Sequence, residues 1–397
     1  MAKLIVLFVV AFVDMVGLVL ILPLLPYYAT DLGASATMVG MLVAAFSVAQ
    51  LAFAPVWGRM SDRLGRRPAI LFGLAVTAVS YVVFAYARSV ELLFISRFVQ
   101  GIGGGTIGVV QAYVADASRP EDRTKALGWL SAVTSLGAVA GPGLGSLLDA
   151  ALGRTAPGLA AAVLATGTAV FAWRFLSESK GMRASGAITA PAAGAPATGR
   201  SALARVLTHW REPAPRLIWI YAIGIGAFYG IGPVTPLLLA KRFGITEHTI
   251  GFIFMYFGGM GVVVRAGILG PLVDRLREAR LSRLGIVCLA AGLALAAIAR
   301  TWPVLIASIT LMPLGAAFVF PCVTGLLSQV VPSAERGLYM GVQHTFGGVS
   351  RMAWPVAAGF AMDHFGMGVP FAVAAALVAL TLLLTGTLEG YLRRQPA

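Results

Sequence analysis

A few ionisable side chains interrupt the long apolar stretches of this sequence. Asp14, Arg97, His344 and Arg351 each lie well inside a run of apolar residues. A charged aspartate at the centre of an apolar helix costs about 2.5–3.5 kcal/mol on an insertion scale, so Asp14 either faces water and titrates or pairs with a base. Histidine is a natural proton switch. These residues predict proton transfer or the binding of a charged substrate. The alternatives are ion pairing for Asp14 and a hydrogen-bonded core role for His344.

Residues for other kinds of chemistry are missing from the sequence. The two cysteines, Cys288 and Cys322, lie in apolar runs and predict small core residues rather than a metal site or a disulfide framework. The sequence shows no nucleophile triad, metal cluster or phosphate-binding loop. We therefore expect no enzyme activity, no metal site and no cofactor.

The composition indicates what must position the ionisable residues. Of 397 residues, 58% are apolar and 12% are charged, whereas soluble proteins carry about 45–50% and about 25%. This favours an all-α membrane protein, and a spanning helix needs about 20 mostly apolar residues. On that basis we predict twelve transmembrane helices, at Leu4–Tyr28, Met38–Trp57, Pro68–Ala87, Leu92–Ala115, Ala126–Ala150, Ala156–Phe175, Leu217–Leu239, Thr249–Leu269, Leu284–Ala299, Pro303–Val331, Leu338–Met362 and Val369–Tyr391.

The twelve predicted spans form two halves. A Pro-, Ala-, Gly- and Thr-rich stretch within residues 177–216 has few large apolar side chains, so we predict a flexible cytoplasmic linker there. It separates six-helix bundles at 1–176 and 217–397. The pattern G-x-x-x-D-R occurs at Gly58–Arg63 and again at Gly270–Arg275. Such a match at corresponding helices predicts a parallel internal repeat.

The basic residues predict the orientation. With both termini inside, 22 of the 30 Lys and Arg residues fall in inside loops and tails, five fall outside, and three (Arg97, Arg265 and Arg351) stay within spans. The positive-inside rule therefore places both termini in the cytoplasm. It also accounts for the net charge of +14 without nucleic acid.

The loop after the second predicted span carries glycine, aspartate and arginine at six positions within ten residues. Glycines permit a tight turn and close helix approach, the aspartate can face a helix N-terminus, and an arginine can reach a neighbouring carboxylate. Plain positive-inside charge is the alternative. The positions are Gly58, Asp62, Arg63, Gly65, Arg66 and Arg67.

This loop is similar to the signature of the major facilitator superfamily of transporters, and the resemblance extends over nearly the whole chain. It implies a cytoplasmic gate in which Asp62 docks on the start of the eleventh span and Arg66 pairs with Asp116. The second copy departs from the pattern because Arg277 and Glu278 stand where Gly and Arg are expected.

The fourth predicted span resembles a motif that the family associates with proton coupling. Arg97, Gln100 and Gln111 share one helical stripe with several glycines. A polar stripe on an apolar helix faces the bundle interior or a cavity. A packing face of small residues is the alternative.

The fifth and first spans resemble those of drug–proton antiporters within the superfamily. The fifth carries the antiporter helix motif Gly128, Gly137, Gly141, Pro142 and Gly145, which implies a seal between the halves, with generic helix packing as the alternative. In the same subfamily, the first span carries an acid in the region of Asp14.

We therefore expect a proton-driven exporter of lipophilic organic compounds that works by alternating access. Its expected partners are a small organic substrate, protons and the lipid bilayer, and we expect a monomer in the cytoplasmic membrane of a prokaryote. An importer or exporter of a specific metabolite or lipid, by symport or uniport, is the alternative, followed by a non-transporting sensor. Aromatic candidates for the cavity lining are Phe228, Tyr229, Tyr256 and Trp354.

Overall fold

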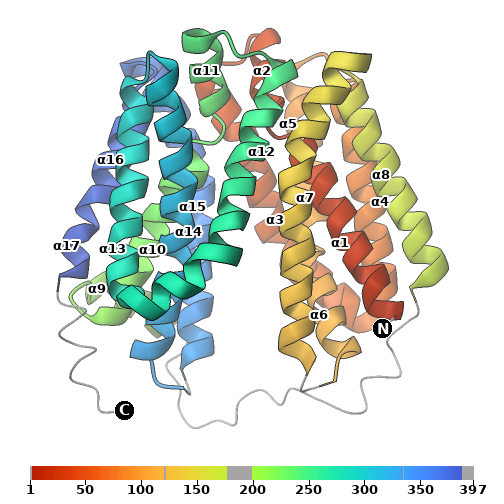
Figure 1. The fold of residues 1–397 in the computed structure, drawn as a ribbon. Helices are drawn as coiled ribbons and strands as arrows, with labels where there is room; N and C mark the ends of the chain where they lie inside the picture. The colour runs from red at the N-terminus through yellow and green to blue at the C-terminus, as the bar shows by residue number, and fades with distance from the viewer. Residues whose placement is uncertain (1, 120–121, 177–198, 334, 387–397) are drawn as a thin grey trace. The chain divides into compact units, whose positions relative to one another are not determined.

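A computed structural model describes residues 2–119, 122–176, 199–333 and 335–386. Every regular element in these ranges is a helix (Figure 1), which confirms the all-α prediction. The first part of the chain forms α1 (Ala2–Leu20), α2 (Leu25–Asp31), α3 (Ala36–Leu64), α4 (Arg66–Ala85), α5 (Val90–Gly104), α6 (Ile107–Ala117), α7 (Arg123–Leu152) and α8 (Ala156–Phe175).

The second part begins with a short helix and includes one π-helical turn, Val264–Ile268. Its helices are α9 (Gly199–Thr208), α10 (Pro213–Gly230), α11 (Thr235–Phe243), α12 (Glu247–Val263), α13 (Leu269–Ile298), α14 (Trp302–Val330), α15 (Arg336–Phe365), α16 (Val369–Leu380) and α17 (Leu382–Thr385).

Each of the twelve predicted spans overlaps one of these helices or a consecutive pair. Within the described residues, eight helical segments are long and apolar enough to cross a membrane by length and composition alone, and α10 with α11, bent by 45°, makes a ninth. Of the remaining predicted spans, the eleventh lies in α15, which carries His344 and Arg351. The twelfth begins with the shorter α16 and α17, and its last residues, 387–391, lie outside the described residues.

The boundaries of the eighth and ninth predicted spans are wrong. Residues 270–283, expected as a loop, are helical and belong to α13. The helix changes direction at Arg277, where φ is 62° and ψ is 155°. Arg, Leu, Glu and Ala are good helix formers, so the charged run between the spans is helical on both sides of the break at Arg277.

The chain separates into two compact units. One comprises Met1–Ala190 with Leu239–Gly258, and the other comprises Pro191–Leu238 with Gly259–Ala397. The start of α12 thus packs with the first unit, which the sequence does not predict. Part of the expected flexible linker, at Gly199–Thr208, is the helix α9, and residues 177–198 lie outside the described residues.

The predicted repeat is visible in the packing of each unit. A Cβ on Gly103 would lie 2.9 Å from the carbonyl oxygen of Gly73, so α5 crosses α4 at backbone contact. A Cβ on Gly315 would lie 2.6 Å from the carbonyl oxygen of Gly285, where α14 crosses α13. Each residue of the second pair stands 212 positions after its counterpart. Small residues allow such close crossings.

A pair of hydrogen bonds repeats with the same offset. Ser96 Oγ donates to the Ser80 carbonyl at 2.9 Å, and Ser308 Oγ donates to the Gly292 carbonyl at 2.8 Å. The two halves therefore share side-chain contacts as well as helix order, which supports the parallel repeat.

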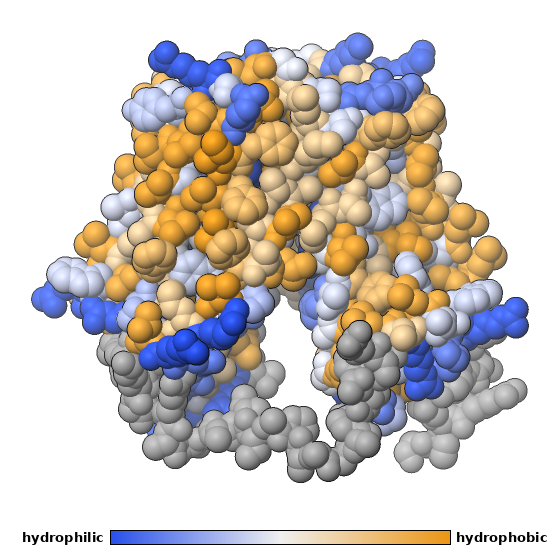
Figure 2. Space-filling view, turned by 180° about the vertical axis from the view of Figure 1, so that it is seen from behind, coloured by the Kyte–Doolittle hydropathy of each residue, from blue (hydrophilic) through white to orange (hydrophobic). Residues whose placement is uncertain are grey.

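Many large apolar side chains are exposed on the helix surfaces, among them Leu152, Val163 and Leu383 at 70–78%. On the face drawn in Figure 2, hydrophobic side chains cover the middle of the helices and hydrophilic side chains gather at their two ends. Exposed apolar surface of this extent marks an interaction surface, and here it fits a lipid environment.

Candidate transport site

The first unit contains a buried guanidinium on α5. The Arg97 side chain is 1% exposed, and its Nη1 donates a hydrogen bond to Oε1 of Gln100, one turn along the helix. The guanidinium carbon lies 4.8 Å from the centroid of the Phe46 ring on α3, a cation–π contact. Nε of Arg97 has no hydrogen-bond partner among the described residues.

Asp14 on α1 lines a small cavity beside this pair. The cavity, of about 30 Å³, is lined by the polar residues Asp14, Tyr81 and Gln100 among others and by apolar residues such as Leu18 and Ile107. Its volume admits a water molecule. In the described part of the chain, no basic side chain comes within 4 Å of the Asp14 carboxylate.

Two buried polar atoms beside Asp14 have no partner within the described ranges, the Tyr81 hydroxyl and Gln100 Nε2. Unpaired buried donors cost about 1–3 kcal/mol each, so a water or a polar ligand would be stabilised there. Of the predicted residues, Asp14 and Gln100 meet at this cavity, and Arg97 bonds to Gln100. Gln111 lies on α6 and is exposed, and it does not line the cavity.

Other lining residues were missed by the sequence analysis. Tyr81 and Phe46 are aromatic residues in apolar spans and carry no distinguishing signal, whereas Gln50 and Thr77 are polar residues within predicted spans that could have been noticed. Gln50 also lines a larger groove of about 410 Å³, together with Gly58, Asp62 and Arg66, which the sequence predicts to form a gate.

The contact between Arg66 and Asp116 implied by the resemblance is present. Arg66 Nε lies 3.2 Å from Asp116 Oδ2, and Nη1 lies 3.0 Å from Ser61 Oγ and 3.5 Å from Asp62 Oδ1. Gly65 has a φ of 111°, which lets α4 begin directly after α3. The guanidinium of Arg67 donates to the Trp173 carbonyl on α8.

The gate itself and its other contacts remain predictions. Arg63 is exposed at the end of α3, and the docking of Asp62 on the start of the eleventh span is untested. In the second copy of the loop, Glu278 accepts a hydrogen bond from Gln329 Nε2. Glu278 stands 212 positions after Arg66 and Gln329 stands 213 positions after Asp116, so in the second copy a hydrogen bond to a neutral amide lies near the place of the ion pair.

The glycines of the fifth predicted span contact α1. Cβ atoms on Gly137, Gly141 and Gly145 would lie 2.8 Å, 2.8 Å and 2.1 Å from carbonyl oxygens of successive turns of α1, whereas Gly128 has open space. The close approach to α12 comes from the adjacent Pro142, whose carbonyl would lie 2.0 Å from a Cβ on Gly251. These glycines thus pack two helices of the first half, and a sealing role stays a prediction.

In the second unit, aromatic side chains form a cluster around Phe320 of α14. Tyr221 and Phe228 of α10 approach its ring with centroids at 5.7 Å and 6.0 Å, and Tyr229 lies 5.2 Å from Phe228. His344, exposed on α15, lies 6.4 Å from the Tyr221 ring.

The remaining candidates of the second half are dispersed. Trp354 packs on α10, because a Cβ on Gly226 or Gly230 would meet it at 2.2 Å or 2.4 Å. Arg351, one turn before Trp354, is partly buried. Tyr256 is 41% exposed and belongs to the first unit, whereas the aromatic cluster belongs to the second.

Comparisons with known proteins agree with this architecture. The chain matches the Major Facilitator Superfamily over residues 7–277 and 217–396. It is 29% identical to Multidrug resistance protein 2 of Bacillus subtilis (strain 168), over 94% of this chain and 92% of the relative. It is also 29% identical to the class G tetracycline resistance protein of Vibrio anguillarum, over 86% of each chain.

A solved structure extends the agreement to the fold. The crystal structure of the human organic anion transporter MFSD10 (TETRAN) superimposes with a TM-score of 0.68 and 25% identity, over 97% of this chain and 99% of that one. The protein is therefore a multi-pass membrane transporter rather than an enzyme, and it belongs to the major facilitator superfamily.

Proposed function

We propose that the protein is a secondary active transporter that exports lipophilic organic compounds in exchange for protons, by alternating access. The observation that carries the proposal is the Asp14 carboxylate in a small cavity without a basic partner within the described ranges. The names of relatives, multidrug resistance and tetracycline resistance proteins, support export as the direction.

The cavity suggests how protons and substrate would be coupled. A carboxyl group that cannot form an ion pair is stable in an apolar surrounding when it carries a proton. A substrate that donates a hydrogen bond or brings positive charge would stabilise the carboxylate instead and release that proton. Because Asp14 cannot satisfy both partners, proton and substrate would occupy the site in turn, which is the requirement for exchange.

The same proposal includes the location. The excess of basic residues in alternate loops supports cytoplasmic termini, and several relatives are bacterial proteins. We therefore place the protein in the cytoplasmic membrane of a prokaryote.

A second candidate is the transport of organic anions. It is favoured by Arg97, a buried cation whose guanidinium contacts an amide oxygen and an aromatic ring, and by the name of MFSD10, an organic anion transporter. An anionic substrate would bring a negative charge to the buried Arg97 guanidinium.

The test uses purified protein in proteoliposomes with an imposed pH gradient. We expect the gradient to drive a lipophilic probe such as ethidium or tetracycline uphill, and a proton ionophore to abolish that accumulation. Net transport of the probe that proceeds at the same rate with and without the pH gradient would refute proton coupling. Flux of an organic anion such as fluorescein, with none of the lipophilic probes, would favour the second candidate.

A further inference from the structure

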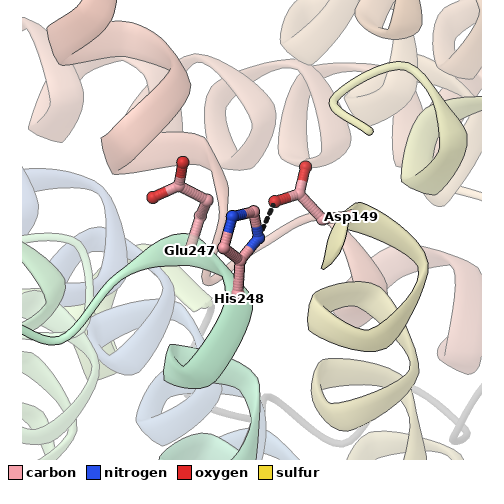
Figure 3. Close-up of side chains that lie close together, drawn as sticks. All are labelled: Asp149, Glu247 and His248. Atoms are coloured by element: carbon pink, nitrogen blue, oxygen red, sulfur yellow. Dashed lines mark ion pairs between the residues drawn. The ribbon is translucent and has the colours of Figure 1, made fainter. Parts of the chain in front are cut away.

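A cluster of metal-ligand side chains joins the end of α7 to the start of α12. Asp149 lies one turn before the end of α7, and Glu247 and His248 are the first two residues of α12. His248 Nδ1 is 2.9 Å from Asp149 Oδ2. Figure 3 shows the imidazole between the two carboxylates. All three residues belong to the first compact unit.

The geometry is close to that of a metal site. One ligand atom from each of the three residues lies within 4.8 Å of the other two. Two ligand atoms bound to a tetrahedral Zn²⁺ at about 2.0–2.2 Å are about 3.3–3.6 Å apart. Closing the three ligands around an ion therefore needs a movement of about 1 Å, which the half-buried side chain of Glu247 can make by changing its rotamer.

The ligand set indicates which ions would bind. Two carboxylates and one imidazole are ligands of Zn²⁺ and related divalent ions, and three protein ligands leave a position for water. An all-oxygen set would favour Ca²⁺ or Mg²⁺ instead. The two carboxylates match the charge of a divalent ion when the imidazole is neutral.

The surroundings hold the central ligand in place. The Asp149 side chain is 3% exposed, and its Oδ1 accepts a hydrogen bond from the Tyr28 hydroxyl at 2.6 Å, so Oδ2 is the oxygen turned to the cluster. Tyr28 is itself fixed by Arg154, whose guanidinium carbon lies 4.4 Å from the centroid of the tyrosine ring. Outer hydrogen bonds of this kind orient the ligands in metal sites.

The backbone of the other two ligands is also fixed to α7. Ser146 Oγ donates to the Glu247 carbonyl at 2.5 Å and accepts from the Gly251 amide at 2.9 Å. The Tyr27 hydroxyl donates to the carbonyl of Ile245 at 2.9 Å, just before α12. A site held by rigid backbone loses little entropy when an ion binds.

We propose that Asp149, Glu247 and His248 form a binding site for a divalent transition-metal ion of the Zn²⁺ type, which would join α7 to α12 at the end of the bundle opposite the Arg66 loop. The site is distinct from the cavity at Asp14 and does not depend on the transported substrate. An ion bound there stabilises the contact between the two helices, so the folded protein becomes more stable in its presence.

The experiment measures Zn²⁺ binding to the purified full chain in detergent, by calorimetry and by thermal unfolding. We expect one Zn²⁺ per chain, a higher melting temperature with Zn²⁺, and no such effect with Mg²⁺ or Ca²⁺. His248→Gln and Glu247→Gln should weaken binding by at least about tenfold, and Tyr28→Phe should weaken it by about tenfold as well.

The controls separate a site from loss of structure. Asp149 is buried, so its replacement can disturb folding, whereas His248 is exposed and its variant should remain folded by size-exclusion chromatography. His364→Gln, an exposed histidine on α15, is the matched control and should bind like the wild type. Equal Zn²⁺ affinity of wild type and His248→Gln, or no binding by the wild type, would overturn the proposal and leave the Asp149–His248 contact as an ion pair only.

Discussion

Gly65 and Arg277 stand at corresponding positions of the two G-x-x-x-D-R copies, and both have a positive φ. The angle is 111° at Gly65 and 62° at Arg277. Glycine adopts such angles freely, whereas a residue with a Cβ is strained there by about 1–3 kcal/mol. The second copy therefore also turns with a positive φ at this position, but with an arginine, whose Cβ disfavours that angle.

Replacing that arginine should stabilise the protein. We expect Arg277→Gly to raise the free energy of unfolding by about 1 kcal/mol, because the relief of strain exceeds the entropy that glycine gains in the unfolded chain. Denaturant unfolding in detergent micelles measures it. The matched control is Arg275→Gly, two residues earlier in α13, which should cost about 0.5–1 kcal/mol. Equal destabilisation by both variants would contradict a strained Arg277.

A second prediction concerns the cytoplasmic gate. If Asp62 docks on the start of the eleventh span, Asp62→Asn should cut transport while leaving expression and thermal stability nearly unchanged, because the side chain keeps its size and loses its charge. Asp274→Asn, at the corresponding position of the second copy, is the control and should transport normally. Normal turnover by a well-expressed Asp62→Asn protein would refute the gating role.

A third prediction concerns proton coupling. Asp14→Asn should abolish uphill transport driven by a pH gradient and spare downhill exchange, because the amide cannot release a proton. His344, exposed beside Tyr221, is the rival proton site. Both fluxes are measured in proteoliposomes for Asp14→Asn and His344→Gln. Uphill transport that survives in Asp14→Asn and fails in His344→Gln would assign the proton to the histidine.

A fourth prediction compares a closely packed glycine of α7 with a glycine of the same helix that has open space beside it. Gly145→Ala should destabilise the protein by about 1–3 kcal/mol, because the new methyl group would lie 2.1 Å from the Leu20 carbonyl oxygen. Gly128→Ala meets nothing within 4 Å and should be neutral or stabilise by up to about 1 kcal/mol, since alanine favours helix. Thermal unfolding of the two variants makes the comparison. Similar melting temperatures would contradict the prediction and show that α1 shifts to accommodate the added methyl group.

The helices were predictable because a long apolar run in a membrane must satisfy its backbone hydrogen bonds internally, and a helix does so within one segment. Asp14 was found by the same contrast, a charge within such a run, and Arg66 with Asp116 came from a resemblance. Tyr81 was missed because an aromatic residue in an apolar span looks like packing. The contact of Asp149 with His248 was missed because 99 residues separate them, and only the packing of α12 against α7 brings them together.

The crossings Gly73–Gly103 and Gly285–Gly315 have a consequence for biosynthesis. Each is made between consecutive helices, α4 with α5 and α13 with α14, that are joined by only a few residues. Both partners of a crossing therefore leave the ribosome within one short stretch of chain. Each pair can enter the bilayer as a helical hairpin with this close crossing already formed, before the rest of its half has been synthesised.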